Sequence, residues 1–390
     1  MDKSRLGFLI LSLACLAPFL TGALTLADTE DEDSLFKSLS VFTEVLGLVQ
    51  RVYVEETSLD ALLEGALDGA ADALDPLATF VPPGGVDEFS RAARIGSSRS
   101  GLTLAKERGI AFVATVGDGS PAAGAGLQAG DVLTEIDGLS SRRTPLWRLR
   151  GILAGEPGEQ VRLQVLRQGR PEEIVLVLAE YAQPLPSLDA GFEVPVLKVS
   201  RFDDRSLAEV RRLLGELASA SAPRLVLDLR GAPPVDGGGG YRLAGLFVEG
   251  EMGRLASRGR ALETFAADAV PVWKGELVVL VDRGTLGPAE VAAAVLQQLA
   301  GARLVGEPTF GHSGRQSLVD LDGGGRLLLT DAFYTGPDGE PLDTRLEPDV
   351  MVRDTSRRFG EQDVPLSELI LRRGIDVLVG EDDDSVQDVA

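Results

Sequence analysis

The residues whose types and spacing could support catalysis lie around a sharp turn between a buried strand and a helix. The apolar run at 278–281 predicts a strand that is buried on both faces. Gly287 fits the N-cap of the following helix, Pro288 its first position and Glu290 its third, where a negative charge suits the helix dipole. Many hydrolases present a nucleophile at such an elbow. Here the elbow (residues 282–287) carries glycine, which has no side-chain atom that can attack a carbonyl.

A polar loop follows this helix and the next strand. The helix continues to residue 299, the strand covers 303–305, and the loop, called the histidine loop below, runs over 306–316. With the first strand they predict a βαβ unit, which should cross over right-handed. The loop contains His312, the one histidine of the chain. We expect a partly solvated loop residue there, and a pH-sensing role is the alternative, because histidine titrates near neutrality.

Composition narrows the possible functions. The chain has 390 residues, 44% of them apolar, enough for two or three domains with sizeable cores. A formal net charge of −22 argues against nucleic acid and anionic membrane surfaces as partners. One cysteine excludes an internal disulfide, and one histidine argues against a His-based zinc site. The glycine-rich stretch 237–240 lacks the Gly-Lys-Ser/Thr ending of a P-loop, so we expect neither a metal nor a cofactor.

The N-terminus has the features of a targeting segment. Lys3 and Arg5 precede an uncharged run at 6–27, which is typical of a cleaved signal peptide or of a retained membrane anchor. Cys15 lies in this run, where a small apolar residue is the simplest interpretation and lipidation a weaker one. Every alternative sends the rest of the chain across a membrane. We expect an extracytoplasmic protein, periplasmic or in the cell envelope, that meets the membrane only through this segment.

A helical segment comes next, behind an acidic linker at 28–33. Ser58 is placed to cap a second helix over 59–74, which should end before Asp75-Pro76. The first helix is predicted from apolar residues at helical spacing: Leu39, Phe42, Leu46, Val49 and Tyr53.

Three short motifs between predicted strands follow one another in residues 97–181. They are Gly-Ser-Pro-Ala at 119–122, Ala-Gly-Leu at 125–127 and Gly-Asp-Val-Leu at 130–133. This pattern resembles a PDZ domain, and residues 145–154 fit the helix beside its groove.

A PDZ resemblance implies peptide binding. PDZ domains add an extended peptide C-terminus as a strand to a sheet edge, and the loop before that edge holds the terminal carboxylate through backbone amides. The partners would be the C-terminal tails of other proteins, and a degenerate or internally filled groove is the alternative. By resemblance, the loop and the start of the accepting strand consist of Ser100, Gly101, Leu102, Thr103 and Leu104.

From about residue 190 the pattern changes to alternating strands and helices. Apolar runs at 196–199 and 225–229 predict buried strands, with a helix capped by Ser206 between them. Residues 317–330 predict a hairpin that turns at Asp322-Gly323. The whole is an α/β core within a protein that is α+β overall. The predicted parts are the targeting segment (1–27), the acidic linker and helical segment (28–96), the PDZ domain (97–181), the α/β core (190–355), and a C-terminal helix with an acidic tail (356–390).

This order of parts resembles the carboxyl-terminal processing proteases, also called tail-specific proteases. These serine peptidases combine a helical N-terminal segment, a PDZ domain and an α/β core. The resemblance covers roughly residues 35–353. Its specific pieces are Leu-Asp-Pro at 74–76, the PDZ motifs, Leu-Asp-Leu-Arg-Gly at 227–231, residues 278–290, residues 304–311, and Leu-Glu-Pro-Asp at 346–349.

The resemblance also implies where a Ser-Lys pair should lie, and there the sequence departs from the family. The family's Gly-Ser-Ala-Ser-Ala-Ser-Glu motif ends at Glu290, so its serine position is Gly287. Thr-Phe-Gly at 309–311 puts the lysine position at His312, and Gln316 matches a family glutamine.

The family's oxyanion loop, Asp-Leu-Arg-Gly-Asn-Pro-Gly-Gly, departs as well. Ala232 stands for the asparagine and Pro234 for the first glycine of the closing pair. Proline has no N–H group to offer to a tetrahedral oxyanion.

The departures together predict a pseudoprotease that keeps the peptide groove and has no catalytic residue. An active homologue of the family or self-association is a further partner expectation. Two alternatives remain. One is an active peptidase with a rearranged site, using Thr285 with His312 or using Ser313. The hydroxyl of Thr285 lies two residues before the serine position, and at a sharp elbow such a side chain points away from the substrate. This argues against the rearranged site. The other alternative is a structural scaffold whose groove is unused.

Overall fold

The computed structural model describes residues 29–220, 222–234, 237–353 and 364–380. The predicted targeting segment with Cys15 and the predicted acidic tail after residue 380 lie outside the described residues. In the part of the chain that is described, no helix combines the length and apolar character that crossing a membrane requires.

The chain divides into two compact units, residues 1–67 and 68–390. Helix α2 (Thr29–Val52) belongs to the first unit, and α3 (Leu59–Asp72) begins there and ends in the second. The hydroxyl of Ser58 accepts a hydrogen bond of 3.1 Å from the amide of Ala61, which confirms the predicted cap.

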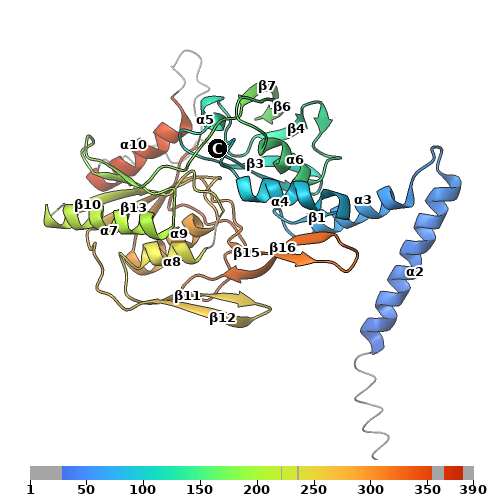
Figure 1. The fold of residues 1–390 in the computed structure, drawn as a ribbon. Coiled ribbons are helices and arrows are strands. Elements are labelled where there is room, and N and C mark those ends of the chain that lie inside the picture. Colours follow the sequence, from blue (N-terminus) through green and yellow to red (C-terminus); the bar gives the residue numbers. More distant parts are fainter. Residues whose placement is uncertain (1–28, 221, 235–236, 354–363, 381–390) are drawn as a thin grey trace, which may run out of the picture. The chain divides into compact units, whose positions relative to one another are not determined.

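A six-stranded sheet forms the middle of the α/β core (Figure 1). Its strands lie in the order β17-β14-β13-β10-β9-β8, and neighbouring strands are parallel except β8 with β9. Val279 and Val281 of β13 pack with helices α7, α8 and α9, whereas Val278 and Leu280 pack with α10. Helices therefore cover both faces, as a parallel sheet requires. The bounds are β8 (Ser187–Asp189), β9 (Val196–Lys198), α7 (Asp204–Ser219), β10 (Arg224–Asp228), α8 (Gly238–Ala244), β13 (Glu276–Val281), α9 (Pro288–Ala300), β14 (Arg303–Gly306), β17 (Val350–Met351) and α10 (Leu366–Val379).

A second sheet joins early and late parts of the larger unit. Strand β16 pairs with β1, β11 and β15, and β12 pairs with β11. Strands β15 and β16 form the predicted hairpin, which confirms that prediction. The bounds are β1 (Thr79–Val81), η1 (Pro83–Gly85), α4 (Val86–Ile95), β11 (Gly250–Ser257), β12 (Arg260–Ala267), β15 (Gly314–Asp320) and β16 (Arg326–Tyr334).

A third sheet forms the PDZ fold around its own apolar core. Its order is β2-β3-β4-β6-β7, with β5 beside β4. Helix α6 closes this core with the buried side chains of Leu146, Leu149 and Leu153. The bounds are β2 (Leu102–Glu107), β3 (Ile110–Val116), α5 (Pro121–Gly124), β4 (Val132–Ile136), β5 (Leu139–Ser140), α6 (Leu146–Leu153), β6 (Gln160–Arg167) and β7 (Arg170–Val177).

Two local predictions were wrong. Helix α7 is capped by Asp203, whose carboxylate accepts a hydrogen bond of 2.9 Å from the amide of Ser206, so Ser206 lies inside the first turn. The second is the glycine-rich stretch 237–240, which the sequence suggests is a loop after the preceding strand and which forms the start of α8. A side chain at Gly240 would meet the carbonyl oxygen of Pro288 at 2.2 Å. Glycine there lets α8 lie close against α9.

Candidate active site and peptide groove

The elbow has the geometry of a strand-to-helix turn and no reactive side chain. Gly287 is buried and is the N-cap of α9, with Pro288 in the first turn, as predicted. Its backbone has φ 59° and ψ −126°. L-residues rarely adopt this conformation, and nucleophile elbows are sharp and strained in the same way. The fold therefore keeps the shape of an elbow around a residue that cannot attack a carbonyl.

The hydroxyl of Thr285 belongs to the turn itself. It donates to the carboxylate of Asp282 at 3.0 Å and accepts from the Asp282 amide at 3.0 Å. The amide of Gly284 donates to the same carboxylate at 3.0 Å. Burial raises the pKa of Asp282, and the charge of Arg230 opposes this shift. The Thr285 side chain is fully buried, so it does not point at a place where substrate could lie.

Glu290 holds the histidine loop against helix α9. Its buried carboxylate accepts hydrogen bonds from the hydroxyl of Thr309, the amide of Gly311 at 2.8 Å, the amide of His312 at 3.0 Å and the hydroxyl of Ser313 at 2.7 Å. Burial raises the pKa of this carboxyl to about 7, although the four donors favour the ionised form. The sequence indicated only a helix-dipole role for Glu290. Its distant partners, 19 to 23 residues away, form the connection between elbow and loop.

Ser313 lies under the elbow with its hydroxyl already bonded. Its Oγ is 2.7 Å from Glu290 Oε2 and 3.2 Å from the carbonyl oxygen of Gly287. The side chain is fully buried. The structure thus brings Ser313 next to the predicted serine position, but in an orientation that joins the loop to the elbow.

His312 is buried, so the predicted partly solvated position was wrong. Its ring is only 6% exposed, packs edge-on against Phe333 with ring centroids 5.3 Å apart, and lies 3.7 Å from a carboxylate oxygen of Asp75. Burial lowers the pKa of His312, and the charge of Asp75 works against that shift. The packing of the Leu-Asp-Pro segment against the histidine loop excludes water, which a reading of the loop alone does not reveal.

A chain of hydrogen bonds connects Gln316 to the imidazole of His312. The side-chain amide of Gln316 donates to Oγ1 of Thr330, which lies 3.0 Å from Nε2 of His312. With its oxygen accepting from Gln316, the Thr330 hydroxyl is free to donate to an unprotonated Nε2. His312 and Gln316 therefore meet through the hydroxyl of Thr330, and neither Thr285 nor Ser313 is among these bonded partners.

Asp75 is a residue of this site that the sequence did not single out. Its carboxylate accepts from the amide of Leu77 at 2.8 Å and from the amide of Thr330 at 3.0 Å. It lies 255 residues before Thr330 in the chain. The Leu-Asp-Pro motif was the available signal, but its partner could not be read from spacing.

The predicted oxyanion loop is held by a buried ion pair. Arg230 binds the carboxylate of Asp228 through two nitrogens at 2.8 Å each and donates to the carbonyl oxygen of Ser367 at 2.7 Å. The pKa of Asp228 is about 2: the charge of Arg230 lowers it in spite of burial. Ala232 is buried, and Pro234 has no N–H to donate.

The loop before strand β2 of the PDZ fold bonds its first backbone amides to groups of the same loop. The amide of Gly101 donates to the carbonyl of Ser97 at 2.7 Å, and the amide of Leu102 donates to the hydroxyl of Ser100 at 3.2 Å. Thr103 pairs with Thr115 of β3. A peptide carboxylate would compete with these bonds for the two loop amides.

The outer edge of β2, where a peptide strand would add, is closed by groups of the same chain. The guanidinium of Arg150 on α6 donates to the carbonyl of Leu104 at 2.8 and 3.3 Å. The amide of Lys106 donates to the carbonyl of Pro76 at 2.8 Å. Burial lowers the pKa of Arg150 to about 10, so it stays charged at neutral pH. A peptide N–H would have to replace Arg150 at Leu104.

The PDZ fold packs directly against the histidine loop. Phe310 stacks on Phe112 of β3 with ring centroids 6.0 Å apart. The ammonium of Lys198, at the end of β9, lies 2.8 Å from the carboxylate of Asp118 after β3. Among the described residues, no cluster of three or more His, Cys, Asp or Glu side chains is arranged to hold a metal ion. The site and the groove are therefore parts of one compact unit.

Comparison with known proteins agrees with this architecture. The sequence model of Peptidase family S41 matches residues 193–352, and that of the PDZ domain matches residues 112–167. The chain is 31% identical to a carboxyl-terminal-processing protease of Synechocystis sp. over 67% of this chain and 63% of the relative. It is 27% identical to a chloroplastic C-terminal processing peptidase of Tetradesmus obliquus, over 72% of this chain and 67% of that one. The chain thus spans about two thirds of the length of these relatives.

A solved structure shares the fold. The photosystem II D1 C-terminal processing protease superposes with a TM-score of 0.67 at 24% identity, over 87% of this chain and 97% of that one. The two sequence models, the curated relatives and this shared fold show that the chain belongs to the family of carboxyl-terminal processing proteases, with the PDZ domain and the S41 core of that family.

Proposed function

We propose that this protein is a non-catalytic member of its family that binds the C-terminal tails of other proteins. The observation that carries the proposal is the elbow: Gly287 has the backbone of an elbow residue and no side chain. Acyl transfer by the family's Ser-Lys route needs a nucleophile, and a base alone cannot form an acyl-enzyme. The assignment of Gly287 to the serine position and His312 to the lysine position is part of this proposal.

The rescue candidates do not supply the missing nucleophile. The Thr285 and Ser313 hydroxyls are fully buried and donate to the carboxylates of Asp282 and Glu290. A nucleophile has to lie within hydrogen-bond reach of its base, and His312 reaches the hydroxyl of Thr330 instead. We also expect weaker stabilisation of an oxyanion, because Pro234 has no backbone N–H to donate where the family has glycine.

Peptide binding is supported by the PDZ architecture. Strand β2 is an edge of its sheet, and α6 lies beside it. β-augmentation needs such an edge and a helix that shapes the pocket. Leu104 contributes a backbone carbonyl that accepts hydrogen bonds at this edge, as its contact with Arg150 demonstrates. A bound peptide would donate a backbone N–H to this carbonyl in place of the Arg150 guanidinium.

The remaining features of the proposal concern place and organisation. We take residues 6–27 as the segment that brings the chain out of the cytoplasm. On the other side of the membrane it would meet the C-terminal tails of other proteins or an active relative of the family. The domain limits predicted from the sequence, 28–96, 97–181 and 190–355, are kept as the working boundaries.

Calorimetric titration with short peptides tests the binding half of the proposal. Peptides that end in a small apolar residue with a free carboxylate should bind the full chain, and the same peptides with an amidated C-terminus should bind at least about tenfold more weakly. Equal affinity for both forms, or no heat and no competition at high peptide concentration, would refute a C-terminal peptide groove and favour the scaffold alternative.

A further inference from the structure

The outer edge of β2 presents backbone groups at every second residue. The carbonyl of Leu104 accepts from Arg150 and the amide of Lys106 donates to the carbonyl of Pro76, so both groups point away from β3. In an antiparallel pair, residues two apart form the hydrogen-bonded pairs with the neighbouring strand. A strand added at this edge would therefore pair first with Leu104 and then with Lys106.

The position of the loop before β2 decides which residue of a tail pairs with which residue of the strand. In the proposed groove this loop holds the terminal carboxylate at the start of β2, so a bound tail runs antiparallel to the strand. The last residue of the tail then lies opposite Leu104 and donates its N–H to the Leu104 carbonyl. The third-last residue lies opposite Lys106, and its carbonyl would accept from the Lys106 amide.

A group of the same chain already occupies the second of these positions. The carbonyl of Pro76 lies 2.8 Å from the amide of Lys106, where the carbonyl of the third-last residue would have to lie. The Lys106 side chain is only 4% exposed, donates to the carbonyl of Thr144 at 3.0 Å and lies 3.5 Å from the carboxylate of Asp68. The backbone amide and the side chain of Lys106 are therefore both bonded within the chain.

Residues 75–79, called the edge segment below, are held from both faces of the PDZ sheet. The side chain of Leu77 is buried against Ala105 and Ala114, on the face of the sheet opposite α6. The hydroxyl of Thr79 accepts from the amide of Trp147 in α6 at 3.3 Å. To reach Lys106, a peptide would have to draw Leu77 out of its apolar cluster, whereas at Leu104 it replaces one side chain.

We propose that the groove recognises only the last two residues of a tail, because the edge segment ends the accepting edge of β2 before Lys106. This inference rests on the proposed function and adds the class of tail that fits. Such a tail ends in a free carboxylate, pairs through the N–H of its last residue and turns away from β2 before its third-last residue. The N–H of that third-last residue is not used, so proline fits there, although it cannot donate in an ordinary added strand.

Calorimetry with backbone-modified peptides tests this register on the unaltered full chain. Short peptides that end in alanine carry a single amide-to-ester replacement, which removes one N–H donor. An ester at the last residue should weaken binding by about three- to tenfold, because it removes the donor to Leu104. An ester or a proline at the third-last residue should change the affinity by less than about twofold. An ester at the second-last residue is the matched control, because the N–H of that residue points away from β2.

The possible results separate this register from the proposed function. An equal loss from the esters at the last and the third-last residue overturns the two-residue register and leaves the proposed function intact. No binding of the unmodified peptide refutes the proposed function, and the register with it. Equal affinity of all the peptides also overturns the register, because it places the peptide away from the edge of β2.

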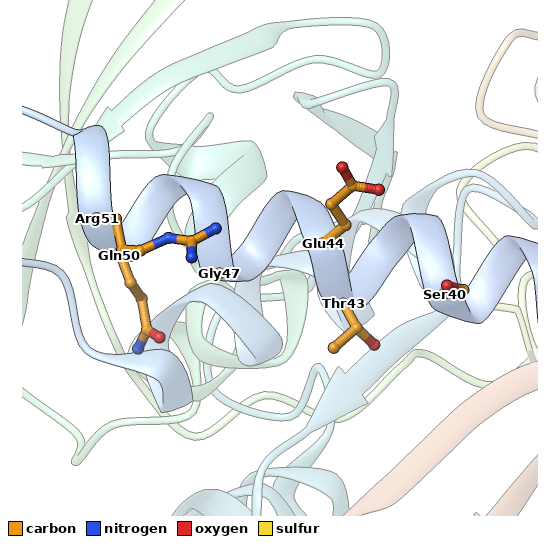
Figure 2. A pocket seen from close by; sticks show the side chains of 6 residues that line it. All are labelled: Ser40, Thr43, Glu44, Gly47, Gln50 and Arg51. Atoms are coloured by element: carbon orange, nitrogen blue, oxygen red, sulfur yellow. The ribbon is translucent and has the colours of Figure 1, made fainter.

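Helix α2 carries a hollow of a different kind (Figure 2). The backbone bonds there lie within the helix, so no strand can add. A peptide in this hollow would bind equally well with any of the esters, which is the result that overturns the register. The hollow is lined by Ser40, Thr43, Glu44, Gly47, Gln50 and Arg51.

Discussion

The elbow and the outer edge of β2 are both closed in this chain, but by different means. At the elbow, hydroxyls and amides converge on two carboxylates, half-buried Asp282 and buried Glu290, and Gly287 itself has no side chain. At the β2 edge, the side chain of Arg150 covers the carbonyl of Leu104, and the amide of Lys106 is bonded to the carbonyl of Pro76. The first closure lies within the core, whereas the closure at Leu104 consists of a single side chain that a peptide N–H would have to replace.

This difference separates what the scaffold preserves from what it can still do. A rearrangement of bonds cannot create a nucleophile at Gly287. A peptide strand can displace a guanidinium from a carbonyl, because it offers an N–H donor in return.

Glu290→Ala should cause the largest loss of stability. It leaves the amides of Gly311 and His312 and the buried hydroxyl of Thr309 without this acceptor, and each unsatisfied group costs about 1–3 kcal/mol. Ser313 keeps the carbonyl of Gly287 as an acceptor. We expect the free energy of unfolding to fall by about 4 kcal/mol or more in a urea titration. Glu263→Ala, at an exposed position of β12, should change it by less than about 0.5 kcal/mol. Similar small losses in both variants would show that Glu290 does not hold the loop.

Gly287→Ala tests the strained elbow. A side chain has to adopt φ 59° and ψ −126° there, which costs about 1–3 kcal/mol. Gly323→Ala, in a hairpin turn with open space around the added carbon, is the control and should be nearly neutral. Thermal or urea unfolding measures both. A Gly287→Ala chain as stable as wild type would contradict the described elbow.

Arg150→Met should open the β2 edge. Methionine replaces the aliphatic part of the arginine side chain but lacks the guanidinium that donates to Leu104. A hydrogen bond from a charged group contributes about 1.5–3 kcal/mol. The affinity for C-terminal peptides should rise about tenfold in calorimetry, because 1.4 kcal/mol corresponds to a factor of ten. Arg148→Met, exposed on the same helix, should leave it unchanged. Weaker binding in Arg150→Met would mean that the guanidinium contacts the peptide instead of competing with it.

His312 should leave a small pH signature in stability. Burial lowers its pKa below the ordinary 6.5, so the unfolded chain takes up a proton at a higher pH than the folded chain does. Wild type therefore loses stability as the pH falls through 6.5, with a slope of at most about 1.4 kcal/mol per pH unit. The His312→Gln variant should lack this loss.

Protonation of Glu290 changes stability with pH in the opposite direction, and comparing wild type with His312→Gln cancels this contribution. Its pKa is raised from 4.5 to about 7, so its contribution to stability is full below pH 4.5 and is lost as the pH rises towards 7. Both chains contain Glu290, and the difference between their unfolding curves isolates His312. A difference that is constant from pH 5 to 8 would contradict the buried, neutral imidazole.

Local signals predicted most of the architecture. The strand before the elbow, the cap at Gly287, the PDZ strands and the hairpin at Asp322-Gly323 follow from apolar runs, turn residues and caps. These depend on neighbours within a few residues, so they are visible in one sequence.

The contacts that define the candidate site depend on packing between distant segments. Asp75 reaches Thr330 only because the Leu-Asp-Pro segment packs against the core, and Arg150 reaches Leu104 because α6 packs on β2 within the PDZ fold. The burial of His312 has the same origin. Contacts between segments that are far apart in the chain leave no periodic pattern in the sequence. The sequence therefore predicted a partly solvated histidine.

Cleavage of an unstructured reporter protein with a small apolar C-terminus decides whether the elbow is catalytic. Wild-type protein is incubated with the reporter at equimolar concentration, beside Thr285→Ala, Ser313→Ala and Gly287→Ser/His312→Lys variants. The account predicts that wild type and both alanine variants leave the reporter intact, and cleavage by the double variant alone would support the proposed register. Cleavage by wild type that is lost in Thr285→Ala or in Ser313→Ala would contradict the account.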